Sequence, residues 1–134
     1  MDAASVATDI GVVAVLAGLL SLDRRSAFQV MVSQPLVCVA GLGVLLGDPE
    51  TGVQLGALLQ LLWMSSFLFG ASVPPHETMG SAVVGGIVLL YGKHVAPPDL
   101  AVWSMAVLLG APMAIVGRWL DVRLDRSNTR LAER

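Results

Sequence analysis

Charged residues avoid the middle of this chain, and this avoidance limits the possible folds more than any other feature. Of 134 residues 18 are charged, but only five charges lie between Ser26 and Gly117: Asp48, Glu50, Glu77, Lys93 and Asp99. A soluble domain of this size needs a large polar surface, which so few charges cannot supply. With 55% hydrophobic residues and a mean hydropathy of +0.76, the sequence predicts an all-α integral membrane protein.

Two features of the chain limit its processing and its redox chemistry. Cys38 is the single cysteine, so an internal disulfide and a cysteine metal cluster are excluded, and its position in an apolar run predicts a packing role. The N-terminal sequence MDAASVATD is acidic, and no clear small-residue cleavage site follows the first apolar run. A cleavable signal peptide is therefore not expected.

Uncharged stretches predict four to five membrane segments, at residues 3–22, 26–47, 51–71, 79–92 and 100–117. The strongly apolar part of the second, from Leu36 to Leu46, gives only roughly 16 Å of helix against a hydrocarbon core of about 30 Å. The fourth is also short and is rich in glycine. These two segments are either re-entrant or discontinuous helices, as in transporter substrate sites, or ordinary short helices.

Arginines indicate how the chain is oriented. Arg24 and Arg25 follow the first predicted span, and five more arginines lie beyond residue 117. The positive-inside rule places both regions in the cytoplasm and the N-terminus outside, with an even number of crossings between them. The sequence thus predicts a membrane domain over residues 1–117 and a basic cytoplasmic tail helix over 118–134, which runs into the cytoplasm or along the headgroups.

Glycines with a spacing of four predict close contacts between helices. They occur as Gly43-Val-Leu-Leu-Gly47 and Gly52-Val-Gln-Leu-Gly56, on either side of the sequence Gly-Asp-Pro-Glu-Thr. Small residues at this spacing let backbones approach in lipid. Asp48 between them is expected to act as a turn and cap residue for the following helix.

Glu77 is the sharpest functional candidate, because ionisable groups at membrane depth are costly. It follows Pro74-Pro75, which cannot continue a helix and lack two backbone donors. One interpretation is a non-helical segment lining a polar cavity, where Glu77 accepts sugar hydroxyls or a proton. The other is an interfacial loop that begins a helix, with Glu77 favourably placed in the first turn.

The two histidines do not predict a metal or catalytic centre. His76-Glu77 opens the HExxH pattern, but Gly80 stands where the second histidine is needed, so no metal site is expected. His94, next to Lys93, is expected in a loop. No phosphate cradle, nucleotide motif, serine elbow or nucleic-acid patch is found, so no cofactor, catalytic residue or nucleic-acid partner is predicted. A polar contact or loop role is expected for both histidines.

Gln60 and Trp63 lie within a predicted span and share one helix face. An unpaired amide in lipid is unfavourable, so Gln60 must bond either to a neighbouring helix or to a polar ligand. An aromatic ring beside an amide is a common arrangement for holding a sugar. It is equally typical of an ordinary packed helix, and the residues alone leave both interpretations open.

Six sequence elements follow one another in order: Asp23, Gln34-Pro35-Leu36-Val37, Leu46-Gly47-Asp48, Gly52 to Gly56, Gln60-Leu61-Leu62-Trp63, and Gly70-Ala71 with Pro74-Pro75. Together they resemble the N-terminal half of the IIC membrane subunit of the mannose/fructose/sorbose-type sugar phosphotransferase system. Members of that family carry, in the same order, an acid after the first helix, an Arg-Pro-Leu-Val or similar stretch, a Leu-Gly-Asp turn, a GxxxG helix, a Glu-Leu-Ile-Trp or similar stretch, and a Gly-Ala…Pro-Pro loop.

This resemblance implies a sugar translocation subunit in the bacterial inner membrane. Such subunits pair with a IID membrane subunit, assemble as trimers of that pair, and pass the sugar to cytoplasmic IIA and IIB phosphocarrier proteins. IIC itself is not phosphorylated. The residues expected to line the sugar route are Gln34, Gln60, Trp63, His76 and Glu77.

The sequence departs from the family pattern in three respects. The resemblance covers only the first half of the family's chain. Gln60 stands where an acid is common, and Gln34 where many members have arginine. An alternative function is therefore a non-transporting assembly or regulatory module. A weaker one is a small drug-type exporter, which needs a single essential membrane carboxylate.

Overall fold

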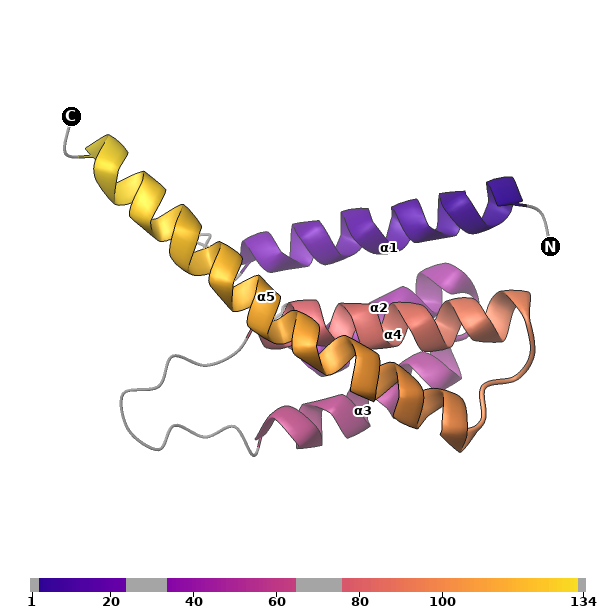
Figure 1. Ribbon diagram of the computed structural model, residues 1–134. Coiled ribbons are helices and arrows are strands. Elements are labelled where there is room, and N and C mark those ends of the chain that lie inside the picture. Colours follow the sequence, from indigo (N-terminus) through magenta and orange to yellow (C-terminus); the bar gives the residue numbers. More distant parts are fainter. Residues whose placement is uncertain (1–2, 24–33, 65–75, 133–134) are drawn as a thin grey trace.

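The computed structural model describes residues 3–23, 34–64 and 76–132, and the regular elements in these ranges are five α-helices (Figure 1). Their bounds are α1 Ala3–Asp23, α2 Pro35–Leu46, α3 Pro49–Met64, α4 Glu77–His94 and α5 Leu100–Ala132. The predicted all-helical fold is confirmed for these ranges.

The α2–α3 hairpin forms where the sequence carries its turn residues. Pro35 occupies the first turn of α2, where its missing N–H is no loss. Gly47 ends the helix with φ 89°, a left-handed conformation that favours glycine. Asp48 then caps α3, because its Oδ1 accepts a hydrogen bond from the Thr51 N–H at 3.1 Å. The predicted cap role of Asp48 is confirmed.

Glycines bring α2 and α3 into backbone contact. A Cβ added at Gly52 would lie 2.8 Å from the Gly43 Cα, and one added at Gly56 would lie 2.9 Å from the Leu36 carbonyl oxygen. No larger residue fits at Gly52 or Gly56 without moving the partner backbone. The predicted close contact is confirmed for Gly43, Gly52 and Gly56, whereas Gly47 serves as the helix cap.

Helix α4 is the centre of the bundle, with α1, α2, α3 and α5 all packed against it. Its glycines face neighbouring side chains, as at Gly85 against Val39. Cys38 is fully buried in the core, as predicted. The buried apolar residues form two clusters, Val39, Leu55, Leu59, Val84, Val88 and Ala106 in one, and Cys38, Leu42, Leu46, Ala82 and Leu89 in the other.

Within the described ranges, two helices are long and apolar enough to cross a bilayer, over Ala3–Ser21 of α1 and Leu100–Thr129 of α5. Helix α2 has 12 residues and is short, as expected. The prediction that residues 79–92 form a second short segment is wrong, since α4 has 18 residues. It is longer because Glu77 begins it and Lys93 and His94 end it, charges that suit the two ends of the helix dipole.

The last predicted span and the predicted tail helix form one continuous helix. Helix α5 has 33 residues, roughly 50 Å at 1.5 Å per residue. Asp99 begins it by accepting a hydrogen bond from the Val102 N–H at 2.9 Å. Its C-terminal part projects beyond the other helices, and α5 crosses them obliquely (Figure 1). The division at residue 117 is therefore not a break in the helix.

Successive helices alternate in direction, which gives the bundle two distinct ends. One, here called the His76 end, gathers the starts of α2 and α4 and the end of α3, beside Ala114 to Asp121 of α5. The opposite His94 end holds the end of α4 and the start of α1, joined through Asp9.

Candidate functional site

All five predicted site residues lie at the His76 end of the bundle. Gln34 precedes α2, Gln60 and Trp63 lie in the last turns of α3, and His76 and Glu77 begin α4. Three different elements therefore carry these side chains to one end. Pro74 and Pro75, which the sequence interpretation of Glu77 invoked, lie outside the described residues.

Trp63 is held in one orientation by α4. Its indole Nε1–H donates a hydrogen bond to the Ser81 hydroxyl oxygen at 3.0 Å. Ser81 is fully buried, and a Cβ added at neighbouring Gly80 would lie 3.0 Å from Cζ2 of the Trp63 ring. Sequence reasoning missed Ser81. The sequence did contain a signal for it, because Ser81 is a hydroxyl residue in the glycine-rich run Gly80 to Gly86.

Gln60 bonds to a neighbouring helix, one of the two alternatives left by the sequence. Its Oε1 accepts a hydrogen bond from the Leu36 N–H, in the first turn of α2, at 3.4 Å. Gln34 occupies the N-cap position of α2 but makes no side-chain cap bond. An amide from α3 thus satisfies an N–H that the local cap residue leaves open.

His76 joins α4 to α5. Its side chain is buried, and its Nδ1 accepts a hydrogen bond from the Met79 N–H at 3.2 Å, which caps α4. Nδ1 therefore carries no proton in the neutral ring, and the proton is on Nε2. The distance between Nε2 and Oδ2 of Asp121 on α5 is 3.6 Å. The His76 N–H also donates to the Ala114 carbonyl oxygen at 3.0 Å. The expected polar contact role of His76 is confirmed.

Glu77 lies in the first turn of α4 and is half-buried. A carboxylate is stabilised there by the positive end of the helix dipole. This position meets the geometric condition of the second interpretation of Glu77, as the opening acid of a helix. It also leaves the carboxylate at the same end as Trp63 and Gln60.

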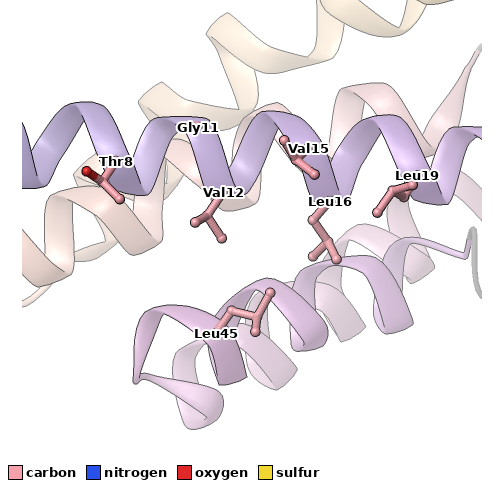
Figure 2. Close-up of a pocket in the computed structure, with 7 residues that line it drawn as sticks. All are labelled: Thr8, Gly11, Val12, Val15, Leu16, Leu19 and Leu45. Atoms are coloured by element: carbon pink, nitrogen blue, oxygen red, sulfur yellow. The ribbon is translucent and has the colours of Figure 1, made fainter.

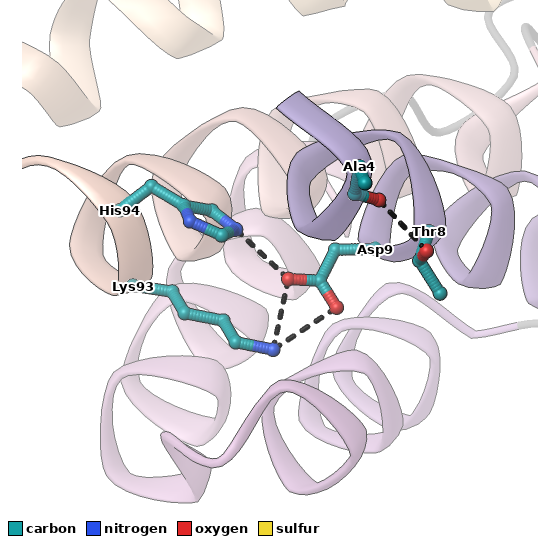
Figure 3. Close-up of polar contacts among 5 residues, drawn as sticks. All are labelled: Ala4, Thr8, Asp9, Lys93 and His94. Atoms are coloured by element: carbon teal, nitrogen blue, oxygen red, sulfur yellow. Dashed lines mark hydrogen bonds and ion pairs between the residues drawn. The ribbon is translucent and has the colours of Figure 1, made fainter. Parts of the chain in front are cut away.

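A second polar cluster lies at the His94 end (Figure 3). Asp9 of α1 accepts hydrogen bonds from the Lys93 ammonium, with contacts at 2.8 and 3.0 Å, and lies 2.8 Å from His94 Nε2. The loop placement predicted for Lys93 and His94 is wrong, because the last turn of α4 contains both, whereas the polar contact expected of His94 is confirmed. Sequence reasoning missed Asp9 as their partner, since 84 residues separate it from Lys93.

Three cavities lined by described residues have mainly apolar walls, and none of them is lined by a predicted site residue. One of about 380 Å³ lies between α1 and α2 (Figure 2). Thr8, its one hydroxyl-bearing lining residue, donates a hydrogen bond to the Ala4 carbonyl oxygen at 2.8 Å. Apart from the Thr8 oxygen, the side chains that line this groove are apolar and offer no hydrogen-bonding group to a sugar. The lining residues are Thr8, Gly11, Val12, Val15, Leu16, Leu19 and Leu45.

Metal-binding chemistry has no candidate among the described residues. In residues 3–23, 34–64 and 76–132, no three His, Cys, Asp or Glu side chains are grouped closely enough to hold an ion. The predicted site residues at the His76 end supply two amides, an indole, an imidazole and a carboxylate, which are groups that hydrogen-bond hydroxyls.

Comparisons with known proteins give consistent relatives. The PTS system mannose-specific EIIC component of Escherichia coli is 24% identical over 122 residues, which cover 91% of this chain and 44% of that protein. The sorbose-specific EIIC component of Lacticaseibacillus casei is 26% identical over 101 residues, 75% of this chain and 36% of that protein. The chain thus spans less than half the length of these two relatives.

A shorter relative is matched over more of its length. The putative N-acetylgalactosamine permease IIC component 2 of Escherichia coli is 30% identical over 106 residues, covering 75% of this chain and 74% of that protein. No solved structure matches this chain.

The match to the family model covers nearly the whole chain, whereas the Lacticaseibacillus casei protein and the shorter relative each match 75% of it. Residues 7–134 match the family described as the PTS system sorbose-specific IIC component. The apolar helices α1 and α5 agree with a family of membrane proteins. On this match, the chain belongs to the sorbose/mannose-type IIC component family of the sugar phosphotransferase system.

Proposed function

We propose that this chain forms part of the sugar translocation unit of a phosphoenolpyruvate-dependent phosphotransferase system of the mannose/fructose/sorbose type. The observation that carries the proposal is the gathering of an amide, an indole and a carboxylate at one end of a bundle of this family. Gln60 and Trp63 come from α3, and Glu77 comes from α4.

The His76 end is proposed to face the cytoplasm. The C-terminal part of α5, with Arg118, Arg123 and Arg126, leaves the bundle on this side. Among the described residues, the His94 end holds one Lys or Arg side chain, Lys93, which is paired with Asp9. The positive-inside rule then places the N-terminus outside and the sugar residues toward the compartment where phosphorylation occurs.

Each proposed site residue has a chemical role toward the sugar. The indole ring of Trp63, fixed by Ser81, offers a flat surface to sugar C–H groups. The Glu77 carboxylate accepts hydrogen bonds from hydroxyls, and the Gln60 amide nitrogen donates them. Gln34, at the start of α2, adds a second amide, and His76 positions the start of α4 beside them.

Partners follow from the family in the same proposal. A IID-like membrane subunit completes the membrane complex, as an oligomer in the bacterial inner membrane. Cytoplasmic IIA and IIB proteins supply the phosphoryl group, and IIB phosphorylates the sugar. This chain contributes binding and passage, and no catalytic residue.

The test is sugar uptake by cells that supply the remaining phosphotransferase components. A panel of sorbose, mannose, fructose and N-acetylgalactosamine is offered to the parent chain and to Glu77→Gln. We expect uptake of at least one sugar by the parent and a clear loss with Glu77→Gln at equal membrane abundance. Glu50→Gln, an exposed acid in the first turn of α3, is the matched control and keeps parent uptake.

The second candidate function is a non-transporting assembly or regulatory module. It is favoured by the intramolecular bonds of Gln60, Trp63 and His76, which occupy polar atoms that a sugar would need. Sugar binding by the purified chain distinguishes the two. Absence of binding and of uptake, with a stable homo-oligomer, supports the module and overturns the transport proposal.

A further inference from the structure

The projecting part of α5 carries a basic stripe, defined here as Trp119, Arg123 and Arg126. These residues follow one another at spacings of four and three, so they lie on one face of the helix. All three are exposed. Nothing in the proposed sugar path uses them.

Acidic residues on this part of α5 lie on the opposite face. Asp121 lies beside His76, with 3.6 Å between its Oδ2 and the imidazole Nε2. Asp125 follows Asp121 at a spacing of four and shares its face. Asp121 therefore lies on the side of α5 that meets the bundle, and Arg123 and Arg126 of the stripe lie on the opposite side of the helix.

The length of α5 places the stripe at the level of lipid headgroups. Helix α5 begins at Leu100, and about 20 helical residues span a hydrocarbon core of about 30 Å. Trp119 is the twentieth residue of α5 and directly follows Arg118, which ends the uncharged run of residues 100–117, so the sequence places Trp119 at the boundary of the core. Tryptophan is enriched at this level in membrane proteins. Arg123 follows about 6 Å further along the helix, within the headgroup layer, and Arg126 follows about 10 Å further, just outside this layer, where a long arginine side chain can reach back to the headgroups.

Trp119 also fixes the position of Arg123. The Arg123 guanidinium carbon lies 3.8 Å from the centroid of the Trp119 ring, a cation–π contact. The N–H donors of arginine lie in the plane of the guanidinium group, so a guanidinium held over a ring face keeps them available for a planar acceptor. Arginine binds phosphate oxygens in this way, through two parallel hydrogen bonds.

We propose that the basic stripe binds the phosphate of an anionic phospholipid headgroup. Trp119 lies among the upper acyl carbons and the glycerol region, while Arg123 and Arg126 bond the phosphate. The proposal depends on the membrane placement of α5 and not on sugar transport, so uptake and lipid binding can fail independently.

An acidic protein surface is the competing occupant. The depth argument favours lipid, because Trp119 lies at the boundary of the hydrocarbon core and Arg123 lies about one turn beyond it, where a soluble partner must displace lipid to reach them. A partner of the phosphocarrier type would be expected to contact the end of the helix instead.

The experiment measures lipid binding by the purified full chain in detergent. Phosphatidylglycerol and phosphatidylcholine are titrated separately, and bound lipid is counted by native mass spectrometry. We expect tighter binding of phosphatidylglycerol, weakened by added salt. Arg123→Gln should reduce its affinity about fivefold, since one basic residue near an anionic leaflet contributes about that factor.

Arg118→Gln is the matched control. It makes the same change in charge one residue before Trp119, on a different face of α5. We expect it to leave the preference for phosphatidylglycerol unchanged. Trp119→Leu removes the stacking partner of Arg123 without changing charge, and it should weaken phosphatidylglycerol binding as well.

Three outcomes overturn the proposal. Equal binding of the two lipids removes the headgroup specificity. An equal loss with Arg118→Gln and Arg123→Gln shows a general charge effect without a site. Capture of a purified IIB protein by the parent chain but not by Arg123→Gln, with no lipid preference, assigns the stripe to a protein partner.

Discussion

The indole N–H of Trp63 on α3 donates a hydrogen bond to the buried hydroxyl of Ser81 on α4, with 3.0 Å between nitrogen and oxygen. This bond crosses between two helices at the His76 end, and it is the contact that fixes the aromatic surface of the candidate site. Since Gly80 supports the same ring, α4 determines where the tryptophan of α3 lies.

A double-mutant cycle tests this contact. Trp63→Phe, Ser81→Ala and the double variant are compared by the free energy of unfolding in mixed detergent micelles. We expect a coupling energy of about 0.6 kcal/mol, the typical value for interhelical hydrogen bonds in membrane proteins. Additive effects of the two substitutions would show that the bond does not form in the folded protein.

Substitution of Gly52 should separate the α2–α3 hairpin. In Gly52→Ala the new Cβ would lie 2.8 Å from the Gly43 Cα, and neither backbone can move without disturbing its helix. We expect a loss of about 1–3 kcal/mol in the free energy of unfolding, as for other overpacked sites.

Gly41→Ala is the control for Gly52→Ala. Gly41 also lies within a helix, but an added Cβ there meets no atom within 4 Å. The gain in helix propensity is the same for both substitutions, about 1 kcal/mol. Gly41→Ala should therefore be neutral or stabilising, and an equal loss in both variants would contradict the packing explanation.

Gln60 is predicted to stabilise α2 from a different helix. Gln60→Leu removes the acceptor of the Leu36 N–H and should lower the free energy of unfolding by about 1 kcal/mol. Gln60→Glu keeps an acceptor and places negative charge near the positive end of α2, so its stability should equal or exceed that of the parent. Parent stability in the leucine variant would show that the amide makes no useful bond.

His76 is expected to act through folding. His76→Ala removes the side-chain cap of α4 and should cost about 1 kcal/mol of stability. His76→Asn supplies another strong cap acceptor and should recover most of that stability.

Uptake by the two His76 variants separates a capping role from sugar contact. With a capping role only, His76→Asn restores uptake together with stability. If His76→Asn is stable but fails to take up sugar, the imidazole itself contacts the substrate.

Sequence alone determined the helical class, the candidate residues and the turn chemistry. Charge-free runs predicted four to five segments, and Asp48 was predicted as a turn and cap residue, because helix caps depend on nearest neighbours. The ordered motifs from Asp23 to Pro75 indicated the family that residues 7–134 match.

Only the tertiary structure decided which residues meet. Ser81 met Trp63, Asp9 met Lys93 and His94, and Gln60 capped α2, because these contacts join residues 18 to 85 positions apart. The end of α4 was also predicted wrongly. Two polar residues after an apolar run indicate a loop, but Lys93 and His94 lie in the helix, where both pair with Asp9 of α1. In a chain surrounded by lipid, a polar side chain is stabilised by another element, and a sequence does not specify which one.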